Sequence, residues 1–177
     1  DTWFAGSGSV LNIAVTPCVE VQVDATEESG GERVRVTLEK YGDSYEFDPT
    51  TSRYDKHPLV EAAIALMGVP GGTRFSVNIY SSVPPGASTG TSAAVSVAII
   101  GALGLLQGKR LAPYEVANLA HSVETDRLGL QSGIQDQLAS AYGGICYIQM
   151  HSYPHASVSQ LNIMEDVWLE LERRLTL

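Results

Sequence analysis

The segment from Val83 to Ala94, VPPGASTGTSAA, constrains this chain more than any other part of its sequence. Two prolines lie near its start, two glycines follow, and hydroxyl side chains lead into a run of small and apolar residues at 95–106. Residues 73–81, just before the segment, alternate in polarity as a strand does. The sequence therefore predicts a strand, a rigid loop and a helix in direct succession.

This strand–loop–helix unit is typical of an anion site. The first N–H groups of a helix have no partners within it and lie at the positive end of the helix dipole. Gly86 and Gly90 let the backbone approach a ligand closely, and Thr91 and Ser92 add hydroxyls at the start of the helix. A capped helix alone would explain the hydroxyls, but not the two prolines and two glycines together. We therefore expect a phosphate to bind here.

Hydrophobic periodicity predicts the remaining elements. Strands are expected at 9–16, 18–25, 33–40, 73–81, 145–150 and 158–163, and a turn at 28–32 would join the second and third into an antiparallel meander. Helices are expected at 58–68, after the loop, at 113–129, and from Ser132 or Gly133 to 144, and residues 167–174 form a short helix or lead into a strand. Residues 41–57 are polar and are interpreted as a loop. The whole chain, 1–177, is predicted to be one α+β domain.

Composition excludes several classes of function. A net charge of −9 argues against a nucleic-acid partner, because phosphate backbones bind basic surfaces. Cys18 and Cys146 are far apart and are expected to be buried free thiols rather than a disulfide or a metal site. No uninterrupted apolar run is long enough to span a bilayer, so a cytoplasmic protein without a membrane partner is predicted. Composition is compatible with a homodimer.

A serine hydrolase is one interpretation of the loop. GASTG, residues 86–90, fits the pattern G-x-S-x-G, which would make Ser88 a nucleophile. Its partners would be Asp126 or Asp136 and then His151 or His155. However, this motif requires the serine on a sharp turn directly after the strand, and residues 83–85 lengthen that connection. The phosphate interpretation explains more of the segment, and the hydrolase stays as the alternative.

Two carboxylates could complete a phosphate site. Glu124 is expected near the end of one helix and Asp136 in the first turn of the next, with Gly129 and Gly133 between them to let the chain turn back. Such a pair could provide one ligand for Mg²⁺ and one group that handles a proton. Taken singly, Glu124 could be on a solvated helix face, and Asp136 could compensate a helix N-terminus.

These residues resemble a known family. PPGASTGTSAA resembles the second motif of the GHMP small-molecule kinases, P-x-x-x-G-L-G-S-S-A-A, and differs from it at Ser88, Thr89 and Thr91. SGIQDQLASAYGG, residues 132–144, is similar to the segment that carries the catalytic acid of the family. Its G-x-x-D-Q form is similar to the sugar-kinase branch, which includes galactokinases and bacterial heptose-7-phosphate kinases.

The resemblance implies an ATP-dependent kinase that acts on a hydroxyl of a sugar or sugar phosphate, with ATP and Mg²⁺ as cofactors. Asp136 would take the proton from the hydroxyl, and Ser92 and Glu124 would ligate Mg²⁺. Asp1 would contact the substrate as the last residue of the family's first motif. The ATP phosphates would be held by Pro85, Gly86, Ala87, Ser88, Thr89, Gly90, Thr91 and Ser92.

The resemblance also implies a fold, that of the GHMP kinase N-terminal domain. This fold is a mixed sheet packed with helices and contains a left-handed βαβ crossover, an exception to the usual right-handed rule. Apart from Asp1 the first motif is missing, and so is the third, which belongs to a C-terminal domain. We therefore expect an N-terminal domain truncated at both ends. A catalytically incomplete binding or interaction fragment is the alternative to an active kinase.

Overall fold

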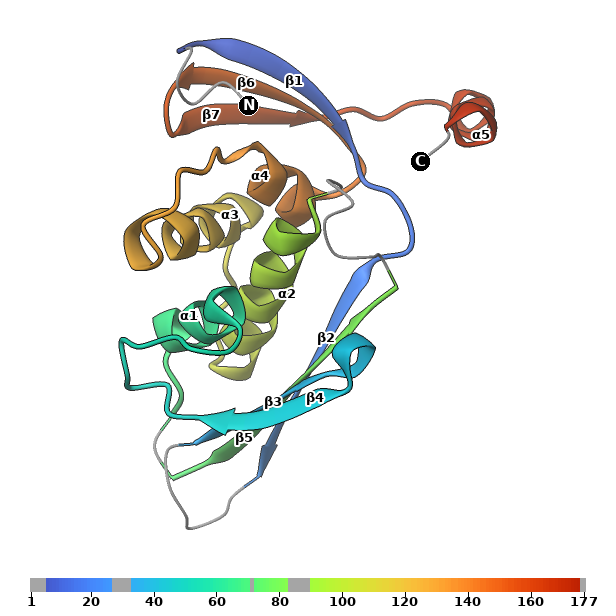
Figure 1. The fold of residues 1–177 in the computed structure, drawn as a ribbon. Helices are drawn as coiled ribbons and strands as arrows, with labels where there is room; N and C mark the ends of the chain where they lie inside the picture. The colour runs from blue at the N-terminus through green and yellow to red at the C-terminus, as the bar shows by residue number, and fades with distance from the viewer. Residues whose placement is uncertain (1–5, 27–32, 71, 83–89, 176–177) are drawn as a thin grey trace.

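Two β-sheets enclose a layer of helices (Figure 1). The computed structural model describes residues 6–26, 33–70, 72–82 and 90–175. The larger sheet has the strand order β2–β5–β3–β4, and the smaller one has the order β1–β6–β7. The strands are β1 (Gly8–Ile13), β2 (Val19–Thr26), β3 (Val34–Leu38), β4 (Asp43–Phe47), β5 (Arg74–Ser81), β6 (Ile145–Ser152) and β7 (His155–Gln160). The α+β class is confirmed.

The larger sheet is organised around β5. β2 pairs with β5 in antiparallel orientation, and β3 pairs with its other edge in parallel orientation. The predicted meander of the second and third strands is therefore wrong, because β5 lies between them. The turn predicted for that meander falls outside the described residues. Alternation of apolar residues shows which face of a strand is buried, but it does not specify which strand lies beside it.

The strand β4 was missed in the segment predicted to be a loop. It pairs with β3 as an antiparallel neighbour, and Tyr45 and Phe47 pack against the core. Asp43, Ser44 and Glu46 disfavour a strand by their intrinsic propensity, which obscures the alternation of the two aromatic residues. A short 3-10 turn, Glu39–Tyr41, separates β3 from β4.

Two helices cover the inner face of the larger sheet. They are α1 (Pro58–Met67) and α2 (Thr91–Leu106), and each begins where the sequence predicts it. Ile99, Ile100 and Leu103 of α2 are almost fully buried and pack with Val36 and Val77 of the sheet. The N-terminus of α2 lies at the end of this helix that is nearer to α4 and the smaller sheet (Figure 1).

The predicted helix at 113–129 is two elements. α3 (Pro113–Ser122) is followed by one wide π-helical turn, Val123–Arg127, in which the Leu128 N–H donates to the Val123 carbonyl oxygen at 3.1 Å. The next helix, α4 (Gln135–Tyr142), begins later than the expected Ser132 or Gly133. Wide turns of this kind are frequent at functional sites.

The smaller sheet covers α3 and α4 from the other side (Figure 1). Its β7 begins at His155, three residues before the predicted strand at 158–163. The last segment is a helix, α5 (Glu165–Arg174), which has no buried residue. Cys146 is buried as predicted, but Cys18 is exposed, so the expectation of two buried thiols is wrong for Cys18. Within the described ranges, every helix is too short or too polar to cross a membrane.

The connection from β3 to β5, which runs through β4 and α1, joins two parallel neighbours. Its left hand stays a prediction.

Candidate active site

Asp136 lies beside the N-terminus of α2. A β-carbon placed on Gly90 would be 3.6 Å from the Cβ, the Cγ and the Oδ2 of Asp136. Gly90 is the residue before α2 and has a φ of 71°, in the left-handed region that favours glycine. The side chain of Asp136, an exposed residue in the first turn of α4, therefore borders the N-terminal end of α2. Gly90 and Asp136, which lie side by side here, are 46 positions apart in the sequence.

Glu124 is buried in the wide turn after α3, with 9% of its surface exposed. Both of its carboxylate oxygens accept hydrogen bonds. The Gln137 side-chain amide donates to Oε1 at 2.9 Å, and the Ser132 hydroxyl donates to Oε2. The alternative of a solvated helix face for Glu124 is therefore wrong. Gln137 follows Asp136 in the chain. The first turn of α4 therefore carries the Asp136 carboxylate and also holds the Glu124 carboxylate through the Gln137 amide.

The remaining residues predicted for the phosphate loop fall in two groups. Thr91 and Ser92 form the first turn of α2, and both line a pocket at its N-terminus. Pro85, Gly86, Ala87, Ser88 and Thr89 lie outside the described residues, and so does Asp1. The structure thus places the helical end of the predicted loop beside Asp136.

The donor set fits Mg²⁺ in kind. Carboxylate and hydroxyl oxygens are the ligands that this ion prefers, and Mg²⁺ usually keeps several waters and binds substrate phosphates as well. In the described part of the chain, no group of three or more His, Cys, Asp or Glu side chains could hold a metal ion. A cation held by Ser92 and Glu124 would therefore complete its coordination with phosphate and water oxygens.

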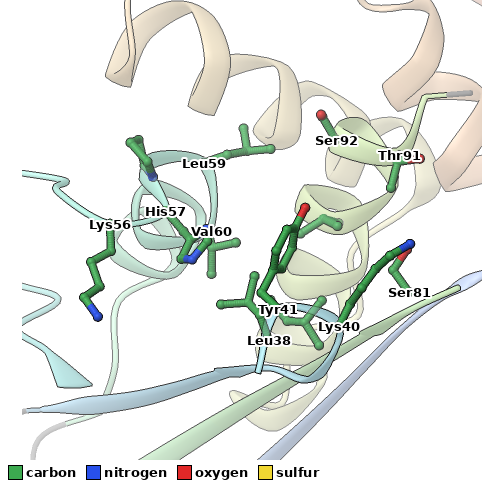
Figure 2. Close-up of a pocket in the computed structure, with 13 residues that line it drawn as sticks. Leu38, Lys40, Tyr41, Lys56, His57, Leu59, Val60, Ser81, Thr91 and Ser92 are labelled. Carbon is green, nitrogen blue, oxygen red and sulfur yellow. The ribbon is translucent and has the colours of Figure 1, made fainter. Parts of the chain in front are cut away.

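A pocket of about 300 Å³ opens beside the start of α2 (Figure 2). Apolar side chains form most of its wall, and polar and aromatic groups lie at its edge. The lining residues are Leu38, Lys40, Tyr41, Lys56, His57, Pro58, Leu59, Val60, Ile79, Ser81, Thr91, Ser92 and Val95. Sequence reasoning missed this pocket, since five different elements (β3, the 3-10 turn, α1, β5 and α2) and the loop before α1 contribute to it. Its volume is at the lower end of the range for small-molecule sites.

An aromatic and charged group lies along one wall of the pocket. The His57 ring stacks on Tyr45 with 5.7 Å between ring centroids and lies 5.9 Å from the Tyr41 ring. Asp43 contacts His57 through Oδ2 at 3.2 Å and the Lys56 ammonium through Oδ1 at 3.5 Å. The hydrogen bond with His57 lowers the pKa of Asp43. These contacts hold the two basic residues at the pocket edge.

Glu61 holds the backbone of the same wall. This side chain is 3% exposed, and its carboxylate accepts the N–H groups of Asp55, Lys56 and His57 at 2.9, 3.2 and 3.0 Å. A negative charge in the first turn of a helix also compensates the helix dipole. An acidic residue three positions after the helix-starting Pro58 was the sequence signal for this role.

His121, His151 and His155 lie in α3, β6 and β7. His121 is buried, and its Nε2 contacts the Tyr153 hydroxyl at 2.9 Å. His151 contacts the Ser157 hydroxyl at 3.0 Å, and His155 begins β7. Asp126 accepts a hydrogen bond from its neighbour Thr125. Because Ser88 lies outside the described residues, the hydrolase alternative stays a prediction.

Comparison with known proteins identifies the family. Residues 58–144, which include the start of α2, Glu124 and Asp136, match the family described as GHMP kinases N terminal domain. This part of the chain belongs to the GHMP kinase family. It is 35% identical over 103 residues to the D-glycero-alpha-D-manno-heptose 7-phosphate kinase of Campylobacter jejuni, a match covering 58% of this chain and 30% of that protein. It is 47% identical over 89 residues to the mevalonate kinase of Thermococcus sibiricus, covering 50% of this chain and 26% of that protein.

Solved structures share the fold of this GHMP kinase domain. The D-glycero-D-manno-heptose 1-phosphate kinase of Bacteroides thetaiotaomicron superimposes with a TM-score of 0.77 at 23% identity, covering 97% of this chain and 56% of that one. The Lactococcus lactis galactokinase gives a TM-score of 0.68 at 20% identity, covering 89% of this chain and 43% of that one. The chain therefore spans about half the length of these relatives.

Proposed function

We propose that this chain is the phosphate-binding and catalytic part of an ATP-dependent kinase that phosphorylates a hydroxyl of a sugar or sugar phosphate. One observation carries the proposal: the Asp136 carboxylate borders the N-terminus of α2 at Gly90. A helix N-terminus binds phosphate, and a carboxylate next to it can receive the proton of an attacking hydroxyl. Membership of the GHMP kinase family supports phosphoryl transfer as the reaction class.

The chemistry assigned to the chain follows from these positions. The N–H groups and hydroxyls at the start of α2 bind the phosphates of ATP and orient them. Asp136 accepts a hydrogen bond from the acceptor hydroxyl and takes its proton as the oxygen bonds to the γ-phosphorus. The bond from the γ-phosphorus to the bridging oxygen breaks, and ADP leaves with its electron pair. Ser92 and Glu124 would hold Mg²⁺, which would supply positive charge to offset that of the phosphates.

We assign the pocket beside α2 to the nucleoside part of ATP. Thr91 and Ser92 belong both to this pocket and to the helix start, so a nucleotide could place its base in the pocket and its phosphates at the helix. Tyr41 and His57 offer aromatic rings to the base, and Lys40 offers a positive charge near the phosphates (Figure 2).

Tyr41→Ala is expected to raise the KM for ATP about tenfold and to leave the KM for the acceptor within about twofold. The reason is the loss of ring contact with the base, which is worth about 1–3 kcal/mol for stacked bases. Tyr147→Ala is the matched control, because Tyr147 is also an exposed tyrosine but lies on the smaller sheet. Equal KM values for ATP in both variants would remove Tyr41 from the nucleotide site.

Ser92→Ala is expected to weaken the binding of Mg²⁺–ATP by about tenfold, as loss of one metal-ligand oxygen would. Binding of ATP in the presence of a chelator should change much less, since the backbone N–H groups remain. Isothermal titration with and without Mg²⁺ measures both affinities. Ser96→Ala is the control, because Ser96 lies one turn further along α2 and donates to the Ser92 carbonyl oxygen. An unaltered Mg²⁺–ATP affinity would exclude Ser92 as a ligand.

The acceptor is tested by an ATP-coupled screen of heptose phosphates, fucose, galactose and arabinose. Mevalonate belongs in the same screen, because the chain is 47% identical over 89 residues to a mevalonate kinase. A response to mevalonate alone would retain phosphoryl transfer and overturn the sugar class. ATP binding without transfer to any acceptor would favour the incomplete binding fragment. Labelling of Ser88 by a serine-directed phosphonate would favour the hydrolase.

A further inference from the structure

We propose that Ser132 and Gln137 form a clamp that holds the Glu124 carboxylate in the orientation in which it binds a divalent cation. We call these two side chains the Glu124 clamp. The inference rests on the proposed function, in which Glu124 is a metal ligand, and it assigns positioning roles to two further residues.

The geometry of the clamp is specific to the carboxylate. Gln137 donates to one oxygen at 2.9 Å and Ser132 donates to the other, so the plane of the carboxylate cannot rotate freely. Gln137 is 1% exposed and Glu124 is 9% exposed, so the hydrogen bond between them is shielded from competing water. Each carboxylate oxygen has two acceptor positions, and each therefore keeps one for a cation.

The buried amide of Gln137 is a poor choice for packing alone. Its Oε1 atom has no hydrogen-bond partner among the described residues, and an unpaired buried acceptor lowers stability. An apolar side chain of the same length would fill the space between α3 and α4 without that cost. The donated N–H to Glu124 is therefore the feature that explains a glutamine at this position.

A second layer holds Ser132 in place. The Tyr153 hydroxyl donates to the Ser132 carbonyl oxygen at 3.0 Å, and the buried His121 approaches the same oxygen at 3.2 Å. The His121 and Tyr153 rings meet edge to face with 5.5 Å between centroids. The backbone that carries the Ser132 hydroxyl is thus tied to α3 and to the turn between β6 and β7. Hydrogen bonds of this outer kind orient metal ligands and tune their affinity.

The clamp also relates the two candidate carboxylates to each other. Gln137 and Asp136 are consecutive in the first turn of α4, so the residue that fixes Glu124 is joined directly to the proposed base. A rigid turn keeps the metal ligand and the base at a constant separation. Such a constraint matters for phosphoryl transfer, because catalysis there consists largely of positioning and charge stabilisation.

The test is Gln137→Met, which keeps the length of the side chain and removes the donor. Binding of Mn²⁺ in the presence of a non-hydrolysable ATP analogue, measured by electron paramagnetic resonance, should weaken at least about tenfold. The Mg²⁺ concentration for half-maximal activity should rise by a similar factor, while the KM for the acceptor stays within about twofold. Gln107→Met is the matched control, because the Gln107 amide donates to Met67 and Gly68 carbonyl oxygens at the end of α1.

Two further variants separate the outcomes, with thermal unfolding measured for each. Ser132→Ala removes only a hydroxyl from a half-buried residue and should weaken Mn²⁺ binding severalfold even if Gln137→Met does not fold. If Glu124→Gln loses Mn²⁺ while both clamp variants bind it like the parent, the clamp is overturned and the proposed function stands. If Glu124→Gln binds Mn²⁺ as the parent does, the metal role of Glu124 fails and the clamp fails with it.

Discussion

Asp136→Asn is expected to lower kcat for phosphoryl transfer by about 10²–10⁴-fold, the usual contribution of a positioned general base. The amide keeps the size of the carboxylate but cannot take the proton from the acceptor hydroxyl. Asp136 is exposed, and it only borders the helix N-terminus, so the affinity for ATP should stay within about twofold. Steady-state kinetics with ATP in excess and a separate binding titration measure the two quantities.

Asp126→Asn is the matched control for that experiment. Asp126 is an exposed aspartate in the wide turn after α3, ten positions before Asp136, and it contacts its neighbour Thr125. Its replacement should leave kcat within about twofold. The same control bears on the hydrolase alternative, in which Asp126 was a candidate partner of Ser88. A kcat for Asp136→Asn close to that of the parent would refute the role of Asp136 as the base.

Glu61→Ala is expected to cause the largest loss of stability among single substitutions near the site, about 3–5 kcal/mol. The carboxylate of this buried residue accepts three backbone N–H groups, and hydrogen bonds to charged groups contribute about 1.5–3 kcal/mol each. Water can partly replace the carboxylate at the exposed residues Asp55 and Lys56, so the three contributions do not add fully. Since a domain is stable by about 5–15 kcal/mol, the loss is a large share of the total.

Urea denaturation measures this loss, and Glu115→Ala provides the comparison. Glu115 also follows a helix-starting proline, but it is exposed and accepts one backbone N–H, that of Ala112, at 2.7 Å. Its removal should cost about 1 kcal/mol. Glu61→Gln, which keeps one acceptor oxygen and loses the charge, should fall between the two. Equal losses for Glu61→Ala and Glu115→Ala would show that burial of the Glu61 carboxylate adds nothing to its effect.

The Glu61 variant also tests the pocket. Lys56 and His57 line the pocket, and Glu61 holds the backbone of residues 55–57. In the folded fraction of Glu61→Ala, the KM for ATP should rise more than the KM for the acceptor. A selective effect of this kind links the stability of the loop to the site that we assign to the nucleotide.

The sequence by itself determined the local elements that carry the site. Gly90, the hydroxyls of Thr91 and Ser92 and the apolar run after them specify where α2 starts, because caps and periodicity act over a few residues. Pro58 and Pro113 likewise specify the starts of α1 and α3. The placement of Asp136 in a first helical turn was also predicted correctly.

Only the tertiary structure decided which of these elements meet. The position of β5 between β2 and β3, the burial of Glu124 against Gln137, and the contact of Asp136 with Gly90 all join residues distant in sequence. The pocket likewise takes its lining from β3, β5, α1 and α2. Periodicity reports which face of an element is buried but carries no information about the partner on that face. That choice depends on the packing of the whole core. The core brings the proposed base, Asp136, to the N-terminus of α2, and it brings the proposed metal ligand, Glu124, to the turn of α4 that carries Asp136.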